Sequence, residues 1–216
     1  MALVEPCLVI DASARDRLRV GVVQGGRWVS QVESPEGALE ATSGCVGDVL
    51  KSAGLQLTDV QSFALNIGPG SMLGIRVAAL TVRAWSALKP RPIYVWESLV
   101  ALATVALDRG QKAPFAVVAE SRLKRWNVLE VNARKEFSPV AECEVEQVKQ
   151  KALPVLALSD EATKIFPGAV KLADPWADLP KFFLEGKLLK LESKPEPLNA
   201  TEDFALWSGE RHRGNS

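Results

Sequence analysis

The sequence predicts an α/β protein, because β-rich runs alternate with longer segments of helical periodicity. The chain opens with three consecutive β-rich runs, at residues 7–10, 18–24 and 28–32. Two helical patterns follow, at residues 37–53 and 72–88, with a β-rich run after each. The chain has 216 residues and is 47% hydrophobic, which is enough for one large domain or two smaller lobes.

The opening runs are expected to form an antiparallel meander. The first is apolar and stops at Asp11. Between the second and third lies Gly25-Gly26, a pair that is typical of a tight hairpin turn.

The first helical pattern, residues 37–53, carries apolar residues on one face at spacings of seven, four and three: Leu39, Val46, Leu50 and Ala53. Gly44 and Gly47 interrupt it, and each costs roughly 1 kcal/mol of helix stability relative to alanine. They indicate either a weak or late-starting helix, or a surface kept small so that another helix can approach closely.

The second helical pattern, residues 72–88, follows a predicted strand at residues 60–67 and is apolar on nearly every side. One stripe consists of Leu73, Val77, Leu80, Ala84 and Leu88, and the rest of the circumference holds Ile75, Ala78, Ala79, Val82 and Trp85. Such a helix is usually buried on two sides. A sheet of its own chain can cover one side, so the other side needs a second layer, from this chain or from a partner.

The second half of the chain gives weaker patterns. A strand is expected at 93–96, a helix at 98–107 with Ser98 as a candidate N-cap, and paired strands at 115–119 and 126–131. Helical patterns follow at 145–152 and 160–166. We therefore divide the chain into an N-terminal lobe at 1–100, a smaller C-terminal lobe at 101–193, and a polar tail at 194–216 that we expect to be disordered after Trp207.

Charge and cysteine content exclude several classes of protein. Lys and Arg balance Asp and Glu at 26 each, which argues against a protein that grips nucleic acid alone through a basic face. Cys7, Cys45 and Cys143 form no CxxC pair and are expected to be reduced, buried thiols.

The N-terminus is predicted to be a strand rather than a signal peptide, and no apolar run reaches the ~20 residues that span a bilayer. We expect a soluble, cytoplasmic protein without a membrane role.

The segment with the most specific pattern is N66-I-G-P-G-S-M-L-G-I-R76. Gly68, Pro69 and Gly70 form a tight turn after a strand, Ser71 can cap the following helix, and Gly74 permits close backbone approach. A strand–turn–helix of this kind presents N–H groups that often bind anions. The bare turn is compatible with a structural role as well as with a ligand site.

Several segments together resemble the TsaB (YeaZ) family. GPGSMLGIR is similar to the family's GPGS-Phe-Thr-Gly-aliphatic-Arg turn and helix, and LVIDAS with RVGVVQGG resembles its first hairpin. VWESLVALA resembles the strand and helix that come next, so the match covers roughly residues 7–107. Met72-Leu73 replace Phe-Thr, and the family's His near Ala38 is missing, which marks a divergent member.

The resemblance implies an actin-like, Hsp70-like or sugar-kinase-like (ribonuclease H-like) fold of two lobes, each with a mixed sheet flanked by helices. It implies a pseudo-enzyme that pairs with the catalytic paralogue TsaD, assisted by the ATPase TsaE, in making threonylcarbamoyladenosine in tRNA. The tRNA would be contacted indirectly, through the complex, and a homodimer on the same helices is a further expectation. In the family the helices at 37–53 and 72–88 form the dimer surface. The expected partner-binding residues are Leu39, Val46, Leu50, Met72, Leu73, Arg76, Val77, Leu80, Arg83 and Ala84.

The two arginines of this set lie seven residues apart on one helix face. Arg76 and Arg83 could form ion pairs with a partner or contact RNA, or they could be the solvated edge of a buried helix.

Catalytic alternatives rest on Asp11 and Ser13. Actin-like ATPases place a phosphate-binding or metal-binding acid where Asp11 ends its strand, whereas a turn residue bonded to the backbone is the structural alternative. The alternative function is therefore a small ATP-binding transferase of the same superfamily. The chain has one histidine, His212 in the tail, so we expect no metal site, no Ser/His/Asp or Cys/His hydrolase and no cofactor, with any ATP bound mainly by partner subunits.

Overall fold

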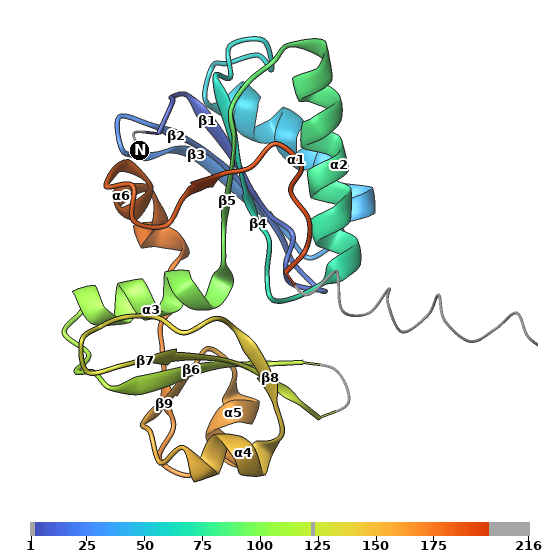
Figure 1. Ribbon diagram of the computed structural model, residues 1–216. Coiled ribbons are helices and arrows are strands. Elements are labelled where there is room, and N and C mark those ends of the chain that lie inside the picture. The colour runs from blue at the N-terminus through green and yellow to red at the C-terminus, as the bar shows by residue number, and fades with distance from the viewer. Residues whose placement is uncertain (1–2, 122–123, 199–216) are drawn as a thin grey trace, which may run out of the picture.

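The computed structural model describes residues 3–121 and 124–198, and it shows two sheets stacked one above the other (Figure 1). The first sheet has the strand order β11-β5-β4-β1-β2-β3, and the second has the order β10-β9-β6-β7-β8. Both sheets mix parallel and antiparallel strands and carry helices on their faces. The predicted α/β class is therefore confirmed. The disorder predicted after Trp207 falls outside the described residues.

The first sheet begins with the predicted meander. Strands β1 (Cys7–Asp11), β2 (Leu18–Gln24) and β3 (Arg27–Ser34) pair antiparallel, and Gly25 and Gly26 make the turn with φ angles of 63° and 67°. Strand β4 (Ser62–Asn66) lies parallel to β1, and β5 (Ile93–Trp96) lies parallel to β4. The hairpin needs two residues with positive φ, which glycine supplies without steric strain.

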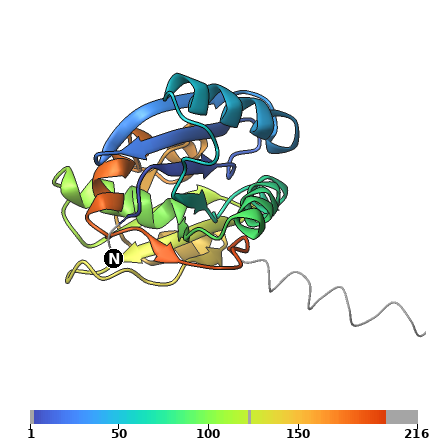
Figure 2. The same cartoon turned by 90° about the horizontal axis from the view of Figure 1, so that it is seen from above.

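Helices α1 (Ala38–Ser52) and α2 (Met72–Leu88) cover one face of this sheet. Their buried side chains, among them Val46, Val49, Ala78 and Val82, pack against Leu8, Ile10, Phe63 and Leu65 of the strands. Seen from above (Figure 2), α2 in green and the later helix α6 in orange lie at opposite sides of the sheet. The two predicted helical patterns are thus both helices, and the glycines of α1 do not break it.

Helix α3 (Ser98–Asp108) lies between the two sheets (Figure 1). Its Ala101 and Val105 join the core of the first sheet, whereas Leu102 and Ala106 join the core of the second. A helix that is apolar on opposite sides can connect two cores in this way. The prediction that Ser98 is the N-cap of this helix is wrong. Glu97 holds the N-cap position, and Ser98 is the first residue of the helix.

The second sheet is built from β6 (Phe115–Glu120), β7 (Trp126–Val131), β8 (Ala141–Cys143), β9 (Val155–Ala157) and β10 (Val170–Lys171). Helices α4 (Val145–Gln150) and α5 (Asp160–Ile165) cover the face turned away from α3 (Figure 1). The predicted pairing of the strands at 115–119 and 126–131 is confirmed.

The chain then returns to the first sheet, although the sequence-based division assigned residues 101–193 to the second lobe. The short helix η1 (Trp176–Asp178), α6 (Leu179–Leu184) and β11 (Lys190–Leu191) all pack on the first sheet. Trp176 stacks on Trp28 with ring centroids 4.6 Å apart, and Asp174 pairs with Arg19 at 2.7 Å. These contacts fasten the segment that leaves the second lobe onto the strands β2 and β3.

No helix within the described ranges 3–121 and 124–198 is long and apolar enough to cross a membrane.

Candidate partner-binding face and the turn beside it

The outer side of α1 and α2 carries large apolar side chains that the chain itself leaves uncovered. Leu39, Leu73, Leu80 and Leu88 are 70%, 68%, 61% and 87% exposed. Half-buried Val77 and exposed Ala84 lie in the same stripe of α2. We call these six residues the leucine face. An exposed leucine by itself needs no explanation, but several gathered on neighbouring helices indicate an interaction site.

The opposite side of α2 explains why this helix is apolar nearly all round. Ile75, Ala78, Ala79 and Val82 are at most 4% exposed and pack toward the first sheet. Among the described residues no second layer covers Leu73 or Leu80. The side predicted to need a further layer is the one that remains in solvent.

Two predicted partner-binding residues lie elsewhere. Val46 and Leu50 are only 5% and 6% exposed and belong to the core beneath α1. The sequence grouped them with Leu39 because spacings of seven and four fit one face, but Leu39 in the first turn projects away from that core. We therefore remove Val46 and Leu50 from the candidate surface.

The remaining predicted residues flank the leucine face. Met72 is half-buried at the start of α2, and Arg76 and Arg83 are half-buried along it. Arg76 takes part in an interaction within the chain. The role of these three side chains in binding stays a prediction.

The glycines of α1 lie on its outer side. Gly44 and Gly47 are exposed, and a Cβ added at either position would meet no atom within 4 Å. No packing within the described chain therefore requires glycine at these positions. The helix is nonetheless continuous over 15 residues from Ala38, so it does not start late. A surface without side chains lets a partner helix come close to the backbone of α1.

The turn at residues 68–71, which we call the GPGS turn, connects β4 to α2. It packs closely against the backbone of the loop after β1 and is hydrogen-bonded to it. The N–H of Ser71 donates to the carbonyl oxygen of Ser13 at 2.6 Å. A Cβ on Gly70 would lie 2.2 Å from that same oxygen, and a Cβ on Gly74 would lie 2.3 Å from the carbonyl oxygen of Ala12. Only glycine permits this approach of two backbones. Ser71 also caps α2, as predicted, by accepting from the N–H of Gly74 at 3.3 Å.

The candidate phosphate ligands Asp11 and Ser13 lie in and next to the loop that the GPGS turn contacts, and they form hydrogen bonds with each other and with Asn66. The Oδ1 atom of Asp11 accepts from the N–H and Oγ of Ser13, at 3.0 and 2.6 Å, and from Nδ2 of Asn66 at 3.1 Å. The Oδ1 atom of Asn66 in turn accepts from the N–H of Gly68 at 2.9 Å and from Oγ of Ser98 at 3.0 Å. Asn66 thus connects the loop after β1, the GPGS turn and the start of α3. Its position at the end of an apolar β-rich run, two residues before Gly68-Pro69, was the available sequence signal.

Replacing Asn66 with alanine should lower the free energy of unfolding by about 2–3 kcal/mol, because it leaves buried partners of a hydrogen-bonded network unpaired. Asn127 is the matched control, since it is equally buried but makes one long bond, 3.4 Å, to the carbonyl oxygen of Glu120. Asn127→Ala should cost about 1 kcal/mol. Urea unfolding followed by tryptophan fluorescence measures both, and equal losses would contradict the central role of Asn66.

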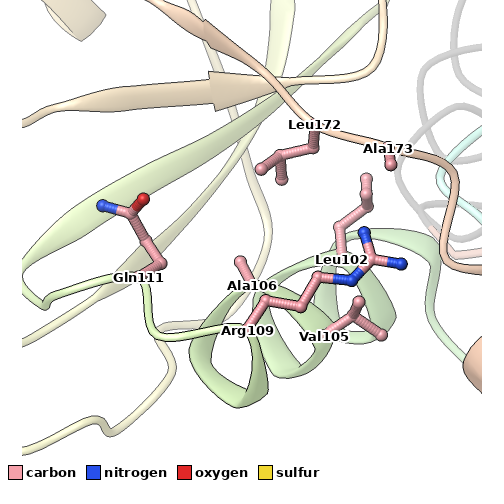
Figure 3. Close-up of a pocket in the computed structure, with 7 residues that line it drawn as sticks. All are labelled: Leu102, Val105, Ala106, Arg109, Gln111, Leu172 and Ala173. Carbon is pink, nitrogen blue, oxygen red and sulfur yellow. The ribbon is translucent and has the colours of Figure 1, made fainter.

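Two hollows among the described residues have their charged lining side chains bonded within the chain. One, of about 100 Å³, lies between α3 and the segment after β10 (Figure 3). It is mainly apolar, and its cationic residue Arg109 pairs with Asp178 at 2.6 Å. A second, of about 390 Å³, lies at the loop after β7, where Glu130 pairs with Lys151 at 2.7 Å and Glu136 accepts from Asn132 at 2.8 Å. Neither offers an unpaired cationic group for a nucleotide phosphate.

The cysteines within the described residues are free, and Cys7 is fully buried. Burial raises the pKa of the Cys7 thiol to about 12, which leaves it protonated and unreactive at neutral pH. No group of three or more His, Cys, Asp or Glu side chains in the described ranges could hold a metal ion.

Comparison with known proteins defines the class of protein first. Two solved structures match over nearly their whole length: YeaZ from Pseudomonas aeruginosa, at 21% identity, and a Pseudomonas aeruginosa protein described as similar to peptidase YEAZ, at 19% identity. Each match covers 89% of this chain, with 98% and 97% of the other chain and TM-scores of 0.63 and 0.65. The chain therefore has the two-lobed actin-like, sugar-kinase-like fold.

The family follows from the sequence. The family model TsaD, described as tRNA N6-adenosine threonylcarbamoyltransferase, matches residues 38–151, which is more than half of the chain. This protein belongs to the TsaD family, and the predicted resemblance is confirmed at the level of family and fold. Membership connects the chain with tRNA modification. No curated protein sequence matches it.

Proposed function

We propose that this chain is a TsaB-like, non-catalytic partner subunit of TsaD in threonylcarbamoyladenosine synthesis. The observation that carries the proposal is the leucine face, with three leucines more than 60% exposed on α2 alone. Burying such side chains contributes roughly 1.5–3 kcal/mol each. A partner that covers them gains a large part of a specific interface.

The outer surface of α1 supports a helix of the partner as the occupant. Gly44 and Gly47 leave open space on the side of α1 that faces solvent. Exposed Glu40 and Asp48 lie on α1, and half-buried Arg83 lies on α2. Charges of both signs around an apolar centre favour one orientation of a bound partner over others.

The polar cluster of Asp11, Ser13 and Asn66 supports a non-catalytic role. A phosphate at this position would need free donors. The N–H of Ser71 is bonded to Ser13, and the N–H of Gly68 is bonded to Asn66. Gly70, moreover, packs directly on the backbone of Ser13. The turn stabilises the fold with the donors that an anion would otherwise use.

Complex formation tests the proposal. TsaD and TsaE would be co-expressed with this chain, and the mass of the purified assembly would be measured by light scattering. A complex that contains this chain and TsaD is expected, and TsaE is expected to join it. Purification of TsaD without this chain, under conditions where both are folded, would refute the proposal.

The alternative function is a small ATP-binding transferase that uses Asp11 and the GPGS turn. Such an enzyme would bind ATP tightly, whereas a non-catalytic subunit would not. Calorimetric titration of the isolated chain with ATP and magnesium should give no binding tighter than about 1 mM, equivalent to about −4 kcal/mol. The physical reason is that the N–H groups of Gly68 and Ser71 are already bonded within the chain. Micromolar binding that Asp11→Ala removes would support the transferase instead.

A further inference from the structure

The described chain ends beside the leucine face. Pro195 and Pro197 are buried, and the N–H of Leu198 donates to the carbonyl oxygen of Ile67 at 2.7 Å. Ile67 immediately precedes the GPGS turn, from which α2 starts. The last anchored residue thus lies at the end of α2 that carries Leu73.

The sequence that continues from this anchor has an apolar cluster of its own. Residues 199–216 read NATEDFALWSGERHRGNS, in which Phe204, Leu206 and Trp207 are the large apolar residues. Phe204 is six residues beyond Leu198, a span of at most about 20 Å for an extended chain. From Leu73 to Leu80, α2 rises by only about 10 Å. The segment between Leu198 and Phe204 is therefore long enough for the apolar cluster to reach both Leu73 and Leu80.

Charge favours the same placement. Glu202 and Asp203 precede the cluster, and the leucine face is bordered by Arg83 on α2. Arg211 and Arg213 follow it, and the exposed side of α1 carries Glu40 and Asp48. A tail that crosses from α2 toward α1 would bring opposite charges together at both ends, although exposed pairs contribute at most about 1 kcal/mol each.

We propose that residues 204–207 of the chain's own tail cover the leucine face and compete with the partner for it. A short tether gives such a segment an effective concentration of about 1 mM, so a weak contact suffices. The competition with TsaD rests on the proposed function, whereas the contact between tail and face does not. The tail would then hold an exposed apolar surface out of water until a partner displaces it.

The test uses the full-length chain with isotope-labelled leucine and valine methyl groups. Phe204→Ser together with Trp207→Ser should shift the methyl resonances of Leu73, Val77 and Leu80. His212→Ser, in the same tail but outside the apolar cluster, is the matched control and should leave them unchanged. Resonances of the leucine face that are the same in both variants would overturn the proposal.

A second copy of the chain is the competing occupant. Spectra and sedimentation at several protein concentrations separate the two cases, because an intramolecular contact does not depend on concentration. Shifts that appear only where the mass doubles would assign the cover to a second copy and overturn the tail proposal.

Binding to TsaD gives an independent measurement. The doubly substituted variant should bind TsaD about three- to tenfold more tightly than the original chain, since no tail has to be displaced. Equal affinities and unshifted methyl resonances would reject the tail contact and leave the partner role intact. Shifted resonances without any binding to TsaD would reject the partner role and leave the tail contact intact.

Discussion

Replacing Leu80 with aspartate is expected to weaken the complex with TsaD by about 100-fold or more, equivalent to about 2.7 kcal/mol. Leu80 lies in the middle of α2 and is 61% exposed, between Leu73 and Leu88. A partner that covers this position would have to desolvate a carboxylate within an apolar contact, which is unfavourable without an ion-pair partner. Val77→Asp should act in the same direction.

The fold itself should tolerate the Leu80 change, because this side chain lies outside the hydrophobic core of the described chain and is not packed against the first sheet. Leu184, on α6 at the other side of the first sheet, is 53% exposed and provides a matched control. Leu184→Asp should leave the affinity for TsaD within about twofold of the original value. Surface-bound TsaD titrated with each variant gives the affinities, and thermal unfolding checks that the variants are folded. If Leu80→Asp binds as tightly as Leu184→Asp, the leucine face is not the binding surface.

Replacing Gly74 with alanine is expected to lower the free energy of unfolding by about 2–3 kcal/mol. Its Cβ would lie 2.3 Å from the carbonyl oxygen of Ala12, which belongs to the backbone and cannot rotate away. The loop after β1 and the start of α2 would have to separate. That movement also strains the hydrogen bond from Ser71 to Ser13.

Gly44→Ala is the matched control for this prediction. Gly44 is also in a helix, but its added Cβ would meet nothing within 4 Å. The substitution should raise the free energy of unfolding by up to about 1 kcal/mol, through helix propensity alone. Alanine would raise helix propensity by the same amount at Gly74. A lower free energy of unfolding for Gly74→Ala would therefore come from the backbone contact and not from propensity. Urea titration followed by circular dichroism measures both variants. A Gly74→Ala protein as stable as Gly44→Ala would show that the close contact between Gly74 and the backbone of Ala12 does not matter for stability.

The two predictions probe different parts of the same helix. The N-terminal end of α2 stabilises the fold through the GPGS turn, whereas the outer side of α2 makes no contact with the core of the described chain. A change at Gly74 should therefore weaken partner binding only as far as it unfolds the chain. A change at Leu80 should weaken binding in a chain that remains folded.

The elements with strong local patterns were predictable from the sequence. Helix α2 and strand β5 begin and end at the predicted residues, and the hairpin at Gly25-Gly26 was evident from its two glycines. The leucine face could be foreseen in part, because no sheet can cover both sides of a helix that is apolar nearly all round. Local sequence carries this information, since periodicity and turn chemistry act over a few residues.

Other features depend on contacts between residues far apart in the chain. Periodicity alone placed Val46 and Leu50 beside Leu39, but the position of α1 on the sheet buries the first two and leaves the third in solvent. The return of residues 176–191 to the first sheet depends on the stacking of Trp176 on Trp28, 148 positions apart in sequence, which no local pattern encodes. Asn66 likewise reads as an ordinary strand-end residue until the loops after β1, β4 and β5 meet around it.

By itself, then, the sequence determined the family, the α/β class and the main helices, because these follow from residue identity and short-range periodicity. The tertiary structure alone decided which apolar residues of α1 and α2 remain exposed and which donors of the GPGS turn are already bonded. Both depend on how close two distant backbones come. At Gly70 and Gly74 that approach leaves no room for a methyl group.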